Sequence, residues 1–308
     1  MARTDSSKKH TLIVILGPTG IGKTNLSIEL AEALKTEIIS CDSRQMYREL
    51  RIGTAVPGPL QLARVQHHFI GNLSIHQYYN ASEFETQALQ TLERIFRNQT
   101  YALMVGGSGL YIDALVNGID DLPTIDKQVR EQLMLRLKNE GLEPLKEELE
   151  KVDPAYYQIA DLNNSKRILK ALEVYYMTGR PYSGFRTKET KPRPFQTLLI
   201  GLTMERQELY RRIDQRVDQM LVDGLVEEAR LFYPYKHLNA LNTVGYKELF
   251  GYFDHEYDLE EAIRLIKRNS RRYAKRQVTY WNRNQNIRWF HPAQMKEILE
   301  YIRTGLGT

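Results

Sequence analysis

A glycine-rich loop between an apolar run and a helical pattern is the strongest single signal in this chain. Residues 17–24 read Gly-Pro-Thr-Gly-Ile-Gly-Lys-Thr, follow the apolar run 11–16 and precede a helical pattern, as a G-x-x-x-x-G-K-[ST] loop requires. Such glycines let backbone N–H groups converge on phosphate oxygens at a helix N-terminus. The loop therefore predicts a polyphosphate site formed by Gly17, Pro18, Thr19, Gly20, Ile21, Gly22, Lys23 and Thr24, with charge from Lys23 and Mg²⁺ held by the Thr24 hydroxyl.

The acid that usually completes the Mg²⁺ site of phosphate-loop NTPases is missing from its expected place. The apolar run 101–105 leads into Gly106-Gly107-Ser108-Gly109 and carries no acid. The run 37–41 instead ends at Asp42, which should lie beside the phosphate loop at the carboxyl ends of parallel strands. Asp42 is thus a candidate to act on a second substrate, the alternative being a helix cap or a turn.

Composition narrows the class of protein. At 308 residues, 42% of them hydrophobic, the chain can form one large α/β domain with an insertion, or two domains. The single cysteine, Cys41, excludes an intrachain disulfide framework. The first apolar run is too short for a signal or membrane helix, so we expect a soluble, cytoplasmic protein.

The order of predicted elements indicates an α/β protein with a P-loop NTPase-like parallel sheet, a helical insertion and a helical C-terminal region. A strand at 11–16, a helix at 23–34 and a strand at 37–41 form a βαβ opening. A helix at 82–98, with Ser82 and Glu85 as a capping box, precedes the strand at 101–105. Further on we expect a strand at 196–202, one long helix at 205–231 and only helices beyond.

Between these elements, residues 126–182 show only helical patterns, broken at Gly141 and at Asp153-Pro154. We therefore predict the first part of the core in residues 1–124. A helical insertion should span 125–194, and residues 195–308 should complete the core and add basic helices.

Two groups of basic residues stand out. Residues 264–283 are rich in Lys and Arg and contain no acid; as a helix, the segment would dock through Ile263, Ile266, Tyr273, Gln277 and Trp281. Its basic faces suit a nucleic acid backbone, the alternative being a solvated charged helix. The second group, Arg206, Arg211, Arg212 and Arg216, follows a strand and could clamp a pyrophosphate, or could pair with nearby acids at the surface.

Several blocks, taken in order, resemble the tRNA dimethylallyltransferase (tRNA isopentenyltransferase) family. They are the phosphate loop, Asp-Ser-Arg-Gln-Met-Tyr at 42–47, Ile-Gly-Thr-Ala at 52–55 and Gly-Gly-Ser-Gly-Leu-Tyr at 106–111, where serine replaces the family's threonine. Residues 166–173, 244–246 and 275–279 are similar to its RNA-contacting segments. The match extends over nearly the whole chain.

The resemblance implies transfer of a dimethylallyl group from its diphosphate to N6 of the adenosine 3′-adjacent to the anticodon in tRNA, assisted by Mg²⁺. Asp42 would be the base, while Lys23, Thr24 and Arg212 would stabilise the departing diphosphate. The expected partners are dimethylallyl diphosphate and the tRNA anticodon stem-loop, with no membrane and with a monomeric enzyme. The implied tRNA-binding residues are Asp42, Ser43, Arg44, Gln45, Ser108, Arg130, Lys166, Arg167, Ile168, Leu169, Lys170, Val244, Gly245, Tyr246, Lys275, Arg276 and Gln277.

Two other functions remain open at this point. An adenylate isopentenyltransferase would share the phosphate loop and the acid but act on free AMP or ATP, and it would have little use for the insertion and the basic helix. A nucleotide-gated RNA-binding module would use both, but an unpaired Asp42 facing RNA phosphates would repel them.

Overall fold

A six-stranded parallel sheet forms the centre of the larger of two compact units. The computed structural model describes residues 10–120, 122–123, 126–187 and 189–305. The sheet has the order β3-β2-β4-β1-β5-β6, and every neighbouring pair is parallel. Its strands are β1 (Thr11–Leu16), β2 (Ile38–Ser40), β3 (His67–His68), β4 (Tyr101–Gly106), β5 (Gln196–Leu202) and β6 (Arg288–Phe290).

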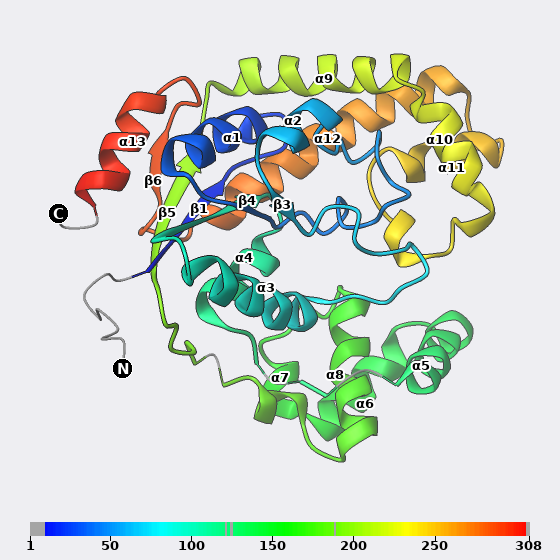
Figure 1. The fold of residues 1–308 in the computed structure, drawn as a ribbon. Helices are drawn as coiled ribbons and strands as arrows, with labels where there is room; N and C mark the ends of the chain where they lie inside the picture. The colour runs from blue at the N-terminus through cyan, green and yellow to red at the C-terminus, as the bar shows by residue number, and fades with distance from the viewer. Residues whose placement is uncertain (1–9, 121, 124–125, 188, 306–308) are drawn as a thin grey trace. The chain divides into compact units, whose positions relative to one another are not determined.

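The strand β1 occupies an interior position between β4 and β5, and all six of its residues are buried. A continuous apolar run suits such a strand, because both of its faces are covered. Helices cover the two faces of the sheet, with α1 (Lys23–Leu34) and α13 (Met295–Thr304) on one side and α3 (Ala81–Phe96) and α4 (Gly109–Asn117) on the other (Figure 1). The predicted parallel α/β core of the P-loop NTPase type is confirmed.

The remaining helices of this unit follow β5 and, in one case, β2. They are α2 (Pro59–Arg64), α9 (Arg206–Val222), α10 (Leu225–Phe232), α11 (Tyr246–Phe253) and α12 (Leu259–Trp281), with 3₁₀ turns at Tyr233–Tyr235 and Asn239–Leu241. The long helix α12 packs against both α9 and α11. This unit comprises Met1–Val116 and Pro192–Thr308, so its chain is interrupted by the second unit.

The second unit, Asn117–Lys191, contains α5 (Lys127–Glu140), α6 (Glu143–Val152), α7 (Pro154–Tyr157), α8 (Ser165–Thr178) and a 3₁₀ turn at Tyr182–Phe185. It has its own core, which includes Leu145, Leu149 and Leu172. The predicted breaks are confirmed, because α5 ends at Gly141 and Asp153 caps α7 by accepting from the backbone N–H of Tyr156. Among the described residues, no helix has the length and apolar character needed to cross a membrane.

Three expectations about single elements were wrong. The predicted helix 205–231 is two helices, because Gly224 adopts a left-handed conformation with φ 99° between α9 and α10. The predicted capping box fails: Asn80 caps α3 by accepting from Ser82 and Glu83, and Glu85 turns inward to pair with Arg193 at 2.6 Å. The C-terminal end is not all helical, since residues 288–290 form β6 along the free edge of β5.

Candidate functional site

The phosphate loop joins β1 to α1 at the carboxyl end of the sheet. Gly20 has φ 80°, and a Cβ there would lie 2.8 Å from Cγ1 of Ile213 on α9. Only glycine tolerates both this conformation and this close contact. The loop is therefore shaped partly by its own glycines and partly by the helix that packs over it.

A pocket of about 350 Å³ opens over this loop. It gathers predicted residues from separate elements: Thr19, Gly20, Gly22, Lys23 and Thr24 from the loop and α1, Asp42 and Gln45 after β2, and Arg212 and Arg216 from α9. Lys23 Nζ donates to the backbone carbonyls of Gly17 (2.7 Å) and Pro18 (2.9 Å). Burial, with a smaller effect of the nearby Arg216 charge, lowers the pKa of Lys23 to about 8.

The helix α9 presents two of its clustered arginines to the pocket. Arg212 and Arg216 are four residues apart, which places them on one face of the helix, and both line the pocket. Arg216 Nη1 donates to Thr19 Oγ1 at 3.3 Å, and burial lowers the pKa of its guanidinium. Arg206 instead lies over the ring of Tyr210. Arg216 thus lines the same pocket as Arg212, the arginine of this cluster that the sequence prediction named.

Asp42 lies where this first pocket meets a second one. Its Oδ1 accepts from the backbone N–H of Arg44 (2.9 Å) and Gln45 (3.4 Å) and so closes a turn, while a role of Asp42 toward a substrate stays a prediction. The second pocket, about 560 Å³, shares Thr19, Asp42, Arg216 and Tyr273 with the first. The carboxylate can therefore face groups bound in either pocket.

The second pocket brings together several of the residues assigned to tRNA. Ser43, Arg44, Val244, Gly245 and Arg276 all line it. Ser108 lies close by, since its Oγ accepts from the backbone N–H of Ser43 at 3.1 Å. Their common location is compatible with one polyanionic ligand, although contact with RNA stays a prediction for each residue.

Comparison with known proteins assigns this arrangement to a family. The model of the IPP transferase family matches residues 45–285. The chain belongs to the IPP transferase family. A tRNA dimethylallyltransferase 1 of Bacteroides fragilis is 54% identical over 296 residues, which cover 96% of this chain and 98% of that protein. The corresponding protein of Phocaeicola vulgatus is 53% identical over 294 residues, with the same two coverages.

Solved structures agree with this assignment. The tRNA isopentenylpyrophosphate transferase of Bacillus halodurans has a TM-score of 0.70 and 36% identity, covering 97% of each chain. A eukaryotic dimethylallyltransferase acting on tRNA has a TM-score of 0.78 and 27% identity, covering 94% of this chain and 75% of that chain. The P-loop NTPase-like core is thus shared with other IPP transferases.

Gln277 and Tyr246, both assigned to tRNA, have side chains committed to contacts within the protein. Gln277 is 6% exposed; its Oε1 accepts from the backbone N–H of Thr19 at 2.9 Å, and its Nε2 donates to the Gly107 carbonyl at 2.9 Å. Tyr246 is fully buried and donates its hydroxyl to Glu228. In this IPP transferase, Gln277 thus joins α12 to the phosphate loop and to the glycine-rich exit of β4.

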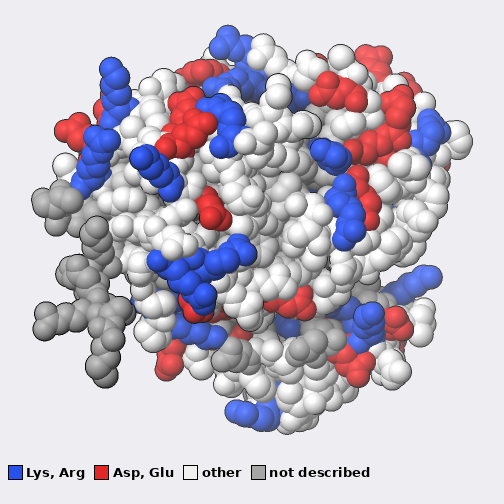
Figure 2. All heavy atoms as spheres, in the orientation of Figure 1, with Lys and Arg blue, Asp and Glu red and all other residues white. Residues whose placement is uncertain are grey.

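The basic helix α12 differs in two ways from the sequence prediction. Its buried stripe consists of Ala262, Ile266, Ala274, Gln277 and Trp281, whereas Tyr273 is 38% exposed and lines both pockets. The acid-free stretch is also partly neutralised, because Lys267 pairs with Asp218 and Arg271 with Asp214 of α9, both at 2.5 Å. Acidic and basic side chains lie side by side along the α9 edge in Figure 2. Arg272 and Arg276 instead line the second pocket.

The residues assigned to tRNA in the second unit divide into exposed and buried ones. Lys166 and Arg167 are exposed at the start of α8, but Ile168 and Leu169 lie in the unit's core. Because their side chains face this core, contact of Ile168 and Leu169 with RNA stays a prediction. Arg130 pairs with the buried carboxylate of Glu173 at 2.7 Å, and burial lowers the pKa of Lys170.

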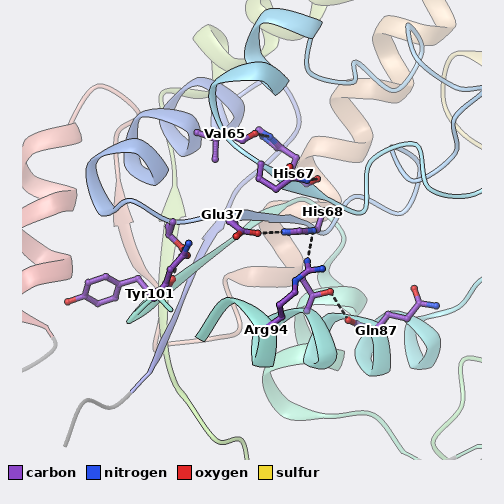
Figure 3. A network of polar contacts seen from close by, with 11 residues as sticks. Glu37, Val65, His67, His68, Gln87, Arg94 and Tyr101 are labelled. Carbon is purple, nitrogen blue, oxygen red and sulfur yellow. Dashed lines mark hydrogen bonds and ion pairs between the residues drawn. The ribbon is translucent and has the colours of Figure 1, made fainter. Parts of the chain in front are cut away.

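The adjacent histidines of β3 point to different surroundings (Figure 3). His67 lines the first pocket with its Nδ1 2.8 Å from the Val65 carbonyl, and burial lowers its pKa. His68 instead lies between Glu37 and Arg94, with its Nε2 2.5 Å from Glu37 Oε2. Neighbouring strand residues face opposite ways, so the pair does not form a joint metal site. The described residues contain no group of three or more His, Cys, Asp or Glu side chains that could hold a metal ion.

Proposed function

We propose that this protein transfers a dimethylallyl group from dimethylallyl diphosphate to N6 of the adenosine 3′-adjacent to the anticodon of a tRNA, releasing diphosphate. The observation that carries the proposal is the position of Asp42 at the junction of two pockets. One pocket holds the phosphate loop, and the other is lined by Arg44, Arg272 and Arg276. A donor diphosphate and an RNA acceptor would therefore meet at a carboxylate.

The chemistry explains why a carboxylate is needed there. The lone pair of the adenine amine is delocalised into the ring, which makes the nitrogen a poor nucleophile. As N6 bonds to the allylic carbon and the carbon–oxygen bond to the diphosphate breaks, Asp42 would accept the N6 proton. The leaving diphosphate would gain charge, which Lys23, Arg212 and Arg216 are placed to stabilise. No phosphoryl group is transferred, which accounts for the absent acid after β4.

The first pocket fits a Mg²⁺–diphosphate complex. Thr24 lines it and offers a hydroxyl oxygen, the ligand type that Mg²⁺ prefers. Because the described residues provide no larger acidic cluster, the ion would complete its shell with water and phosphate oxygens, as Mg²⁺ commonly does. When bound, it would neutralise charge on the departing diphosphate.

On the acceptor side, Tyr273 is the residue best placed to receive a base. It lies on α12 and, like Asp42, lines both pockets, and Arg272 and Arg276 line the second one with it. Unpaired bases are commonly bound by stacking on aromatic rings. We propose that the adenine stacks on Tyr273 while phosphates contact the basic residues. Because one chain supplies both pockets, we propose a monomeric enzyme, acting in the cytoplasm on tRNA.

A single set of reactions tests this function. The protein is incubated with Mg²⁺ and dimethylallyl diphosphate together with an anticodon stem-loop, with AMP, or with no acceptor, and the products are analysed by mass spectrometry. We expect a prenylated stem-loop and unmodified AMP. Prenylated AMP alone would indicate an adenylate isopentenyltransferase, and no prenylated product in any arm would refute prenyl transfer.

A further inference from the structure

Glu228 on α10 holds the loop of residues 51–57, which forms part of both pockets. Its Oε2 accepts from the backbone N–H of Arg51 (3.1 Å) and Ile52 (2.9 Å), and its Oε1 accepts from that of Gly53 (2.9 Å). The Tyr246 hydroxyl donates to the same Oε1 at 2.5 Å. One carboxylate thus accepts from three consecutive backbone N–H groups and a buried phenol.

The other side of the loop is held as well. Gln45 Nε2 donates to the carbonyls of Thr54 (3.0 Å) and Ala55 (3.1 Å). Gly53 lies directly against the ring of Tyr246, where a Cβ would come within 2.6 Å of the ring. Ala55 is kept at φ 48°, a conformation that residues other than glycine seldom adopt. These contacts fix the backbone from residue 51 to residue 55.

Different residues of this loop line the two pockets. Gly53 and Thr54 line the second pocket, and Ala55 and Pro57 line the first. In the first pocket, Ala55 and Pro57 join Ile38, Ile70 and Val105 as apolar lining that the phosphate loop does not provide. A small movement of the loop would therefore change the room available for the hydrocarbon part of a diphosphate ester.

We propose that Glu228 is a positioning residue that fixes the 51–57 loop, so that the first pocket accepts a dimethylallyl chain and rejects longer prenyl chains. The proposal rests on the proposed function. Glu228 lines neither of the two pockets; it acts through the backbone of the loop, and its role is to define chain length. Apolar pockets discriminate by about 10–200-fold per methylene, so a small displacement of the loop is enough to alter selectivity.

The Glu228→Gln variant tests this role, with Glu227→Gln as its control. The amide keeps the size of the side chain, but its NH₂ group cannot accept from a backbone N–H, so at least one of the loop donors loses its partner. Glu227 is exposed on the same helix, and its substitution makes the same change of charge. Tyr246→Phe, which removes only the hydroxyl that contacts Glu228, provides a second and milder variant.

The readout is the ratio of kcat/KM for dimethylallyl diphosphate to kcat/KM for geranyl diphosphate, with the stem-loop as acceptor. We expect Glu228→Gln to lower this ratio about tenfold and Tyr246→Phe to lower it less, while Glu227→Gln leaves it unchanged. The affinity for inorganic diphosphate should stay as in the wild type. Amide hydrogen exchange in residues 51–55 should be faster in Glu228→Gln than in Glu227→Gln.

Two results would overturn the proposal: a ratio within twofold of wild type in both Glu228→Gln and Tyr246→Phe, or unaltered exchange of residues 51–55 in Glu228→Gln. Failure of the underlying function has a different signature, because the wild-type protein itself would then prenylate no acceptor with either donor. If Glu228→Gln does not fold, Tyr246→Phe and its exchange pattern decide the question.

Discussion

Among single residues, Asp42 carries the sharpest prediction. Its Oδ1 also closes the turn to Arg44 and Gln45, so alanine would disturb the loop as well as remove a base. Asparagine keeps the acceptor oxygen. We expect Asp42→Asn to reduce single-turnover prenyl transfer by about 10²–10⁴-fold while diphosphate and stem-loop affinities stay near wild type. A rate within threefold of wild type would remove Asp42 from the role of base.

The buried side chain of Lys23 should make the affinity for diphosphate depend on pH. Burial lowers its pKa to about 8, below the usual 10.5, so the side chain is charged below pH 8 and progressively neutral above it. A bound diphosphate favours the charged form, hence its affinity should fall as the pH rises through 8, by up to about tenfold per pH unit. Because diphosphate itself ionises, the measurement is the ratio of wild-type to Lys23→Arg affinity by calorimetry from pH 7 to 9. A ratio that does not change with pH would contradict the prediction.

At the scale of elements, α12 has basic residues of two kinds. Arg272 and Arg276 line the second pocket, whereas Lys267 and Arg271 are paired with acids of α9. We expect the double variant Arg272→Ala with Arg276→Ala to weaken stem-loop binding and to flatten the slope of log K against log salt by about one unit per lost phosphate contact. Lys267→Ala with Arg271→Ala is the matched control and should change the slope less. Equal slopes for both variants would contradict RNA binding by this face of α12 and would favour the alternative, a solvated charged helix.

The helix α8 requires structural and binding effects to be separated. Ile168 is fully buried in the core of the second unit, so Ile168→Ala should lower the free energy of unfolding by about 2–5 kcal/mol in a denaturant titration. Lys166 is exposed, and Lys166→Ala should change stability by no more than about 0.5 kcal/mol. Only Lys166→Ala can therefore report on RNA contact without a loss of fold. A comparable loss of stability in both variants would contradict this division.

For the molecule as a whole, the elements that could be predicted are those with a strong local pattern in the sequence. Long apolar runs predicted β1, β4 and β5, and glycine spacing predicted the phosphate loop. Two short edge strands lacked such a signal: β6 begins with an arginine, and β3 consists of two histidines. Gly224 was not recognised as the end of a helix, because an isolated glycine is often tolerated within one.

In the candidate site, the residues that could be predicted are those that belong to sequence motifs. Lys23, Thr24, Asp42 and Arg212 were found in this way and line one pocket. Glu228 and the double contact of Gln277 were not, because each depends on segments more than a hundred residues away, which no local periodicity reports. Tyr273 was assigned to the packed face of α12, although it lies one position before the buried Ala274 and faces the pockets.

The position of the prenyl group in the product RNA decides whether the two pockets serve the proposed reaction. A stem-loop with adenosine 3′-adjacent to the anticodon is incubated with dimethylallyl diphosphate and Mg²⁺. One portion of the product is digested to nucleosides to identify the modified base, and another is cut into oligonucleotides and sequenced by tandem mass spectrometry to locate it. A second stem-loop carries purine riboside, which lacks the N6 amine, at that single position. We predict N6-(dimethylallyl)adenosine at that position in the first RNA and no prenylation of the second. Prenyl groups at other adenosines, or in the purine riboside RNA, would contradict the assignment of this site to that reaction.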